Sequence, residues 1–220
     1  MDASLPPRAD PSIEAAVGQA RAALARFGLL LFSDPALPSL VGVIVDEPLR
    51  SSWWGHPRGH VIYAAMNRLE DDPDVLSSKL IAGKVTYVHR NLWPAVYAAG
   101  TGREAWQLNN LSAGARWLLE ETDAHGAVQT DMAVPPREVR ADKRTADFAR
   151  ELERRVLVHA TEFHTPGGAH AKLLETWQRW AATVKFRPPA LSAAEARAEL
   201  EAAAARLPAD GALVRLPWRR

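Results

Sequence analysis

The sequence predicts a mostly helical α+β protein in which a helix and β-hairpin unit, residues 12–100, precedes a C-terminal winged helix, residues 110–180. Three observations favour this fold class. Apolar residues recur at helical spacing in segments that follow a capping residue. Two short β-patterned runs surround each of two glycine-containing turns. In the second half, the order of helix, short element, helix and hairpin is that of a winged helix.

The first half begins with a long helix and an ambiguous apolar stretch. Residues 1–11 are rich in proline and polar residues and are expected to form a flexible tail. Ser12 can cap a helix that runs to about Arg26. Residues 29–32 then form a short buried strand or a helix end, and residues 39–45 fit either a helix or a strand.

A stretch rich in tryptophan and histidine, residues 51–60, leads into the next helix. With His56 as the N-cap, Pro57 falls at the first helical position, where its missing N–H costs nothing. This helix covers about residues 61–69. Residues 78–89 then form two β-patterned runs joined across Ala-Gly, which is a hairpin signal.

A short helix over residues 92–99, capped by Asn91, closes the first half. The Gly100-Thr101-Gly102 sequence marks a boundary between the halves. Ser112 then caps a helix over about residues 113–124.

The rest of the second half completes the predicted winged helix and ends in a tail. Residues 143–154 form a second helix, and residues 156–164 alternate as a strand. Thr165-Pro166-Gly167-Gly168 turns the chain, so that residues 169–174 can return antiparallel. Residues 188–220 form a C-terminal helix and tail, and the alanine-rich helix capped by Ser192 is a docking or solvated helix.

Composition and charge limit the function classes. Apolar residues make up 47% of the chain and charged residues 24%, which is typical of a soluble globular protein. The net charge of +1 means that any basic site for nucleic acid must be local. Because the chain has no cysteine, disulfides and thiolate chemistry are excluded. We expect no cofactor.

The sequence predicts a cytoplasmic protein without a membrane anchor. The N-terminal residues lack the basic segment and apolar run of a signal peptide. The most apolar segment, residues 28–45, is interrupted by Asp34, Pro35 and Pro38, so it cannot be a membrane helix of about 20 apolar residues.

Several short motifs resemble a known family. These motifs are Gly28-Leu29-Leu30, Leu37-Pro38-Ser39-Leu40, the Trp53-Trp54 pair before a helix, and Lys79-Leu80-x-x-Gly83-Lys84-x-Thr86. Over about residues 14–180 the chain resembles the AlkZ-related proteins, bacterial relatives of the winged-helix AlkZ-type DNA glycosylases. The resemblance implies tandem winged helices and a DNA partner.

The chain departs from that family at its chemical motif. The AlkZ glycosylases use a Gln-x-Gln pair, whereas the glutamines here lie at positions 19, 107, 129 and 178. The resemblance therefore implies a DNA-binding architecture and leaves glycosylase activity in doubt.

One candidate site is a pocket formed by the residues around the tryptophan pair, namely Trp53, Trp54, His56, Arg58 and His60. Tryptophan faces stack on nucleobases, and an arginine beside the first turn of a helix can hold a phosphate. This pocket would suit a hydrolase that processes bases or nucleosides. The alternative interpretation is scaffold, with the tryptophans at the seam between the two halves.

A second candidate site is a nucleic-acid-binding surface on the predicted winged helix. Basic residues precede its second helix, and its wing carries polar and basic residues suited to phosphate contact. The residues of this surface are Arg137, Arg140, Lys143, Arg144, His164, His170 and Lys172. The alternatives are an ordinary exposed helix of mixed charge and a plain solvated turn.

Metal binding is not expected at either site. His56 and His60 are four apart, but Pro57 and Gly59 lie between them and the motif has no glutamate. The leading hypothesis is thus a DNA-binding protein, and a hydrolase is the alternative. A third possibility is a protein-interaction module in which the C-terminal helix or the wing forms a homodimer.

Overall fold

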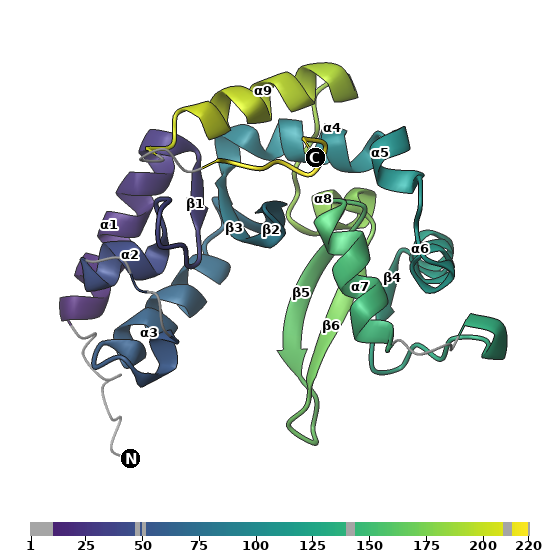
Figure 1. The fold of residues 1–220 in the computed structure, drawn as a ribbon, viewed down its shortest axis with the longest axis horizontal. Coiled ribbons are helices and arrows are strands. Elements are labelled where there is room, and N and C mark those ends of the chain that lie inside the picture. Colours follow the sequence, from purple (N-terminus) through teal and green to yellow (C-terminus); the bar gives the residue numbers. More distant parts are fainter. Residues whose placement is uncertain (1–10, 47–48, 50–51, 140–143, 209–212, 220) are drawn as a thin grey trace, which may run out of the picture.

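The computed structural model describes residues 11–46, 49, 52–139, 144–208 and 213–219. Figure 1 shows an arch in which two lobes hang from a bridge of helices. The predicted α+β class is confirmed, and the described strands form two three-stranded antiparallel sheets. Of the predicted tail, residues 1–11, residues 1–10 lie outside the described residues, and Pro11 begins the first helix.

The first lobe, called here the N-terminal unit, contains a 3-10 turn before its last helix. Its elements are α1 (Pro11–Phe27), β1 (Leu29–Leu31), α2 (Leu40–Val45), η1 (Trp53–Gly55), α3 (Gly59–Glu70), β2 (Val75–Ile81) and β3 (Lys84–His89). The strand order is β1-β3-β2. The predicted hairpin across Ala82-Gly83 is confirmed, and Gly83 adopts a positive φ of 69° that favours glycine.

The second lobe, called here the C-terminal unit, has a similar succession of elements. They are α6 (Ala113–His125), β4 (Ala127–Gln129), η3 (Arg137–Val139), α7 (Thr145–Arg154), β5 (His159–His164) and β6 (His170–Glu175). The strand order β4-β6-β5 matches that of the first sheet. Each unit runs helix, strand, short helical segment, helix and hairpin, but the short segment comprises both α2 and η1 in the N-terminal unit and η3 alone in the described part of the C-terminal unit. The sequence prediction recognised this order in the second half alone.

Capping residues fix the ends of several helices as expected. Ser112 Oγ accepts a hydrogen bond from the Ala115 N–H at the start of α6, and Gly126 ends that helix with a φ of 75°. Three predicted caps are wrong. Helix α1 begins at Pro11, so Ser12 lies within its first turn. Helix α3 begins at Gly59 with Arg58 as its N-cap, and His56 instead ends the η1 turn. The helix after the first hairpin, α4 (Trp93–Thr101), has Leu92 as its N-cap, whereas Asn91 lies in the turn η2 (Arg90–Leu92), which His89 caps.

A bridge joins the two units. It consists of α4 (Trp93–Thr101), α5 (Ala105–Leu108), α8 (Trp177–Thr183) and α9 (Ala193–Ala205). The alanine-rich α9 packs along α4 and buries Ala196 and Leu200, so it docks within the chain. The predicted boundary at Gly100 is not an exposed linker, because Gly100 is buried and a Cβ there would overlap the Trp177 indole.

Trp177 and Trp180, expected to begin a tail, are instead buried in the bridge core. Their rings lie 5.5 Å apart at 80°, and Trp177 Nε1 donates to the Val156 carbonyl at 2.8 Å. This core also receives Leu29 and Leu31 of β1, whereas Leu30 faces a second core under α1, α2 and α3. The first sheet is thus covered on both faces. The C-terminal unit has its own core around Phe148 and Leu152.

Candidate nucleic-acid interface

An aromatic cluster stands on the surface in front of α3, formed by Trp53, Trp54 and Tyr63 and called here the Trp54 platform. The two indoles stack with centroids 4.1 Å apart and planes 24° from parallel. Tyr63, one turn into α3, lies 6.0 Å from Trp54. Trp54 is 69% exposed, which is unusual for tryptophan. The cluster therefore offers an open aromatic face.

The turn beneath the platform is held by local contacts. Trp53 packs edge-on against Phe32 at 5.5 Å and contacts the core under α1 to α3. The His56 N–H donates to the Trp53 carbonyl at 3.1 Å, and the Gly59 N–H donates to the His56 carbonyl at 2.8 Å. A Cβ on Gly59 would lie 3.2 Å from the Trp53 carbonyl oxygen, so glycine lets the helix start close to the turn.

The other three residues of the predicted pocket have separate surroundings. His56 Nδ1 accepts from the Arg58 N–H at 3.1 Å, which is a turn contact. The Arg58 guanidinium donates to the Ile44 carbonyl and ties the start of α3 to α2. His60 is exposed on the first turn of α3. The structure thus places these five residues in one surface stretch, with Trp54 facing outward.

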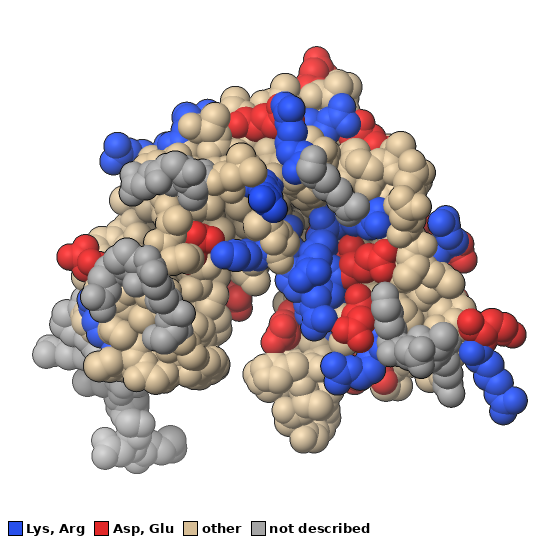
Figure 2. All heavy atoms as spheres, in the orientation of Figure 1, with Lys and Arg blue, Asp and Glu red and all other residues tan. Residues whose placement is uncertain are grey.

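Helix α7 carries two exposed arginines of the C-terminal unit. Figure 2 shows blue side chains on the side of this helix that faces the opening between the lobes, with red side chains next to them. Arg150 and Arg154, one turn apart, are both exposed. Arg150 pairs with Asp147 at 3.0 Å, whereas Arg154 has no ion pair among the described residues and lies against Gly83 of the N-terminal unit.

The predicted basic residues ahead of α7 are described only in part. Arg137 and Arg144 are exposed, and Arg144 is the N-cap of α7. Arg140 and Lys143 lie outside the described residues. The sequence prediction omitted Arg150 and Arg154, although their spacing of four places them on one helical face.

The hairpin of β5 and β6, expected to be the wing, ends in an exposed turn. The Gly168 N–H donates to the Thr165 carbonyl at 2.8 Å, and a Cβ on Gly168 would meet no atom within 4 Å. The rings of His164 and His170 lie 4.4 Å apart across the hairpin, and His170 Nδ1 lies 2.6 Å from Glu162 Oε1. Both predicted histidines therefore stand together near the tip.

Lys172, predicted to belong to the same surface, lies in the seam between the units. Its Nζ donates to Glu153 Oε2 at 2.6 Å, and Lys79 Nζ from β2 donates to the same oxygen at 3.1 Å. The two lysine side chains are 18% and 17% exposed. Burial lowers the pKa of Lys79, an effect that Glu153 opposes and Lys172 reinforces. One carboxylate from α7 thus joins both hairpins.

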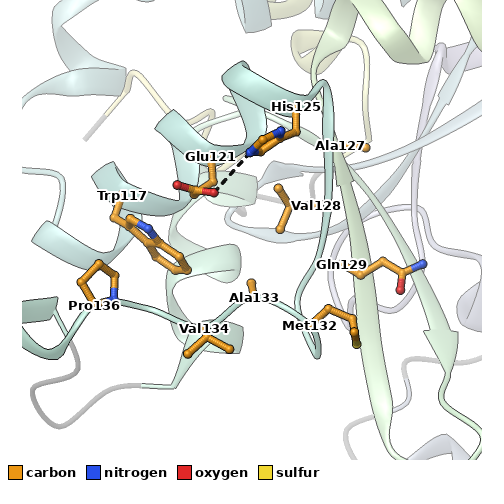
Figure 3. Close-up of a pocket in the computed structure, with 10 residues that line it drawn as sticks. All are labelled: Trp117, Glu121, His125, Ala127, Val128, Gln129, Met132, Ala133, Val134 and Pro136. Atoms are coloured by element: carbon orange, nitrogen blue, oxygen red, sulfur yellow. Dashed lines mark ion pairs between the residues drawn. The ribbon is translucent and has the colours of Figure 1, made fainter.

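A shallow hollow of about 470 Å³ lies on the outer side of the C-terminal unit. Figure 3 shows Trp117 and Glu121 of α6 turned toward a loop that carries Met132 and Val134. His125 pairs with Glu121 at 3.6 Å. The sequence prediction did not single out this surface, because its residues come from segments with no shared motif.

The described part of the chain contains neither a candidate metal site nor a candidate membrane span. Among these residues, no three histidine, aspartate or glutamate side chains are placed to hold a metal ion. None of the helices in the described ranges combines the length and apolar character needed to cross a bilayer.

Comparison with known proteins gave no relatives. No family model, no curated protein and no solved structure matches the chain.

Proposed function

We propose that the chain is a DNA-binding protein built from two winged helices, of the AlkZ-related type. One observation carries the proposal: the two units share the strand orders β1-β3-β2 and β4-β6-β5, and in both a helix, a strand, a short helical segment, a helix and a hairpin follow in turn, with α2 as an addition in the N-terminal unit. A winged helix is a helix-turn-helix followed by a hairpin, and tandem copies are what the resemblance to the AlkZ glycosylases implies.

The third helix of each unit is the proposed DNA-reading element. In helix-turn-helix proteins the recognition helix presents its N-terminal residues to base edges. Both α3 and α7 begin at the open side of the arch and run toward the bridge (Figure 1). The Trp54 platform precedes α3, and Arg144 caps α7. In each unit, residues that the sequence singled out therefore precede the third helix.

Charge on the molecule favours a local, salt-sensitive contact. The chain carries a net charge of +1, so binding would depend on few phosphate contacts rather than on a basic surface as a whole. Arg150 and Arg154 on α7 are exposed and would supply such contacts. Asp147 lies beside them and limits the affinity.

Fluorescence anisotropy of labelled duplex and single-stranded DNA, titrated with the full chain across a salt series, tests the proposal. We expect the chain to bind DNA at about 50 mM salt. The logarithm of the affinity should then fall linearly with the logarithm of the salt concentration. Absence of binding to both DNAs at about 50 mM salt, where phosphate contacts are strongest, would contradict the proposal.

The hydrolase hypothesis gains no support from the geometry. None of the five predicted pocket residues lines the hollow beside α6 or a second hollow beside Trp106 and Trp218. An outward-facing Trp54 cannot exclude water from a reacting bond in the way that an enclosed site does.

A further inference from the structure

We infer that the Trp54 platform is a stacking site for an unpaired nucleobase, so that the preferred partner is single-stranded DNA or a duplex with an extrahelical base. This inference rests on the proposed function, because it assigns a ligand to the N-terminal unit's part of the interface. Its starting observation is that a large aromatic ring is held rigidly with one face covered and most of its surface exposed.

The stacking geometry indicates a preformed site. Trp54 rests on Trp53, and Trp53 rests on Phe32 and the core beneath it. A base that stacks on the outer face of Trp54 would extend an existing aromatic stack without rearranging it. Because the turn is already fixed by its hydrogen bonds and by Gly59, little conformational entropy is lost on binding.

Electrostatics at the platform favour an anionic ligand such as a nucleic acid. The first turn of α3 contains no acidic residue, and its N-cap makes no side-chain hydrogen bond to the helix. The positive end of the helix dipole therefore stays available beside the platform. Arg58 is exposed there as well. A phosphate that flanks the stacked base would meet positive potential.

Contacts at the hairpin tip of this unit favour a base, rather than duplex backbone, as its ligand. In a winged helix that grips duplex DNA, the wing tip is free to approach the backbone. Here the Ala82 N–H donates to the Arg215 carbonyl at 2.7 Å, and Arg154 lies beside the half-buried Gly83. Because the tip is engaged by other parts of the chain, the start of α3 is the more accessible part of this unit, and its largest exposed side chain is Trp54.

The test uses the full chain and the variant Trp54→Ala. Anisotropy is measured with single-stranded oligothymidine, a fully paired duplex, and the same duplex carrying one bulged thymine. We expect Trp54→Ala to weaken binding of the single strand and the bulged duplex by roughly 5- to 150-fold. The affinity for the paired duplex should fall by less than about twofold, and Trp54→Phe should retain part of the preference.

Met132→Ala is the matched control, because Met132 is a similarly exposed apolar residue on the other unit. It should leave all three affinities unchanged. Circular dichroism checks that each variant is folded. If Trp54→Ala does not fold, two other measurements test the inference: the affinities of Trp54→Phe, and the quenching of tryptophan fluorescence in the wild-type chain by oligothymidine. No quenching, or equal weakening for all three DNAs, would overturn the inference.

The outcomes separate this inference from the proposed function. If the wild-type chain binds none of the three DNAs, the proposed function fails. If it binds the paired duplex with a normal salt dependence and Trp54→Ala changes nothing, DNA binding stands and the stacking site is wrong. If Trp54→Ala abolishes a concentration-dependent dimer seen by light scattering while DNA affinities are unaffected, the platform is a protein interface instead.

Discussion

The N-terminal and C-terminal units share one strand order but differ in which parts are free of other contacts. In the N-terminal unit Arg154 packs beside the hairpin tip at Gly83, and the turn in front of α3 carries the exposed Trp54. In the C-terminal unit the tip at Gly168 is open and the third helix carries arginines. With the same strand order, the N-terminal unit therefore exposes aromatic side chains before its third helix, and the C-terminal unit exposes arginines on its third helix.

The two units also differ in how deeply their sheets are buried. The first sheet is sandwiched between two cores, because Leu29 and Leu31 face the bridge and Leu30 faces the helices. Strand β5 of the second sheet is largely accessible. We infer that the N-terminal unit and the bridge form one stable body, whereas the C-terminal unit relies on its own smaller core. Four predictions test this comparison.

The largest effect is expected from removing the indole that joins the units. Trp177→Ala should lower the free energy of unfolding by about 3–5 kcal/mol, because Trp177 is fully buried, hydrogen-bonded to Val156 and packed against Gly100. Urea unfolding followed by circular dichroism measures this loss. Val184→Ala, at the exposed end of α8, is the control and should change stability by less than about 0.5 kcal/mol. A loss below about 1 kcal/mol for Trp177→Ala would show that the bridge core does not unite the units.

A smaller loss of stability is expected when the ion pairs that join the two hairpins at the seam between the units are broken. Glu153→Gln leaves Lys79 and Lys172 facing each other without their shared carboxylate, so it should cost about 1–3 kcal/mol. Hydrogen exchange should rise in both hairpins, β2–β3 and β5–β6. Glu162→Gln removes an exposed carboxylate from β5 and should leave the seam protected. Unchanged exchange after Glu153→Gln would argue against a seam that couples the units.

We expect the arginine charges on α7 to affect the affinity for DNA and not the stability of the fold. The double variant Arg150→Gln and Arg154→Gln should weaken duplex binding several-fold and reduce the slope of log affinity against log salt by up to about 1.8, or about 0.9 for each phosphate that is no longer neutralised. Arg68→Gln is a matched control in the N-terminal unit, since Arg68 is similarly exposed and paired with a carboxylate. If the double variant and Arg68→Gln gave the same slope of log affinity against log salt, the phosphate contacts would lie outside α7.

The smallest effect is the response of stability to acid, for which one partly buried carboxylate in each unit, Asp34 and Glu175, serves as the test. Burial acts to raise the pKa of Asp34, but hydrogen bonds from Lys84 and from the Ala36 and Leu37 N–H groups outweigh it and lower the pKa. In the C-terminal unit, His159 lowers the pKa of Glu175 from 3.5 Å, the long limit of a hydrogen bond. Arg179 adds to this lowering, whereas burial opposes it.

Because both folded-state pKa values lie below the unfolded values, the stability from these groups is present at neutral pH and is lost as pH falls through the folded pKa. The urea midpoint should therefore fall between about pH 5 and pH 3. Asp34→Asn and Glu175→Gln should each flatten that dependence in part. A variant that keeps the full wild-type acid sensitivity would show that its carboxylate does not contribute.

The sequence by itself determined the local elements. Ser112 and Gly126 bound α6, and Ser192 with Glu195 forms the capping box that starts α9. The Ala82-Gly83 and Thr165–Gly168 turns fixed both hairpins. These features could be predicted because they depend on residues within about four positions of each other, where spacing and backbone preference act directly.

The tertiary structure alone decided which of these elements are exposed. The tryptophans at 53 and 54 and those at 177 and 180 are similar in sequence, yet one pair holds an outward face and the other is core. The ambiguous segment at residues 40–45 became a helix where it could bury Leu40 and Ile44 against α1 and α3. Burial depends on partners far along the chain, and for that reason no local pattern could assign the open platform to one unit and the open hairpin tip to the other.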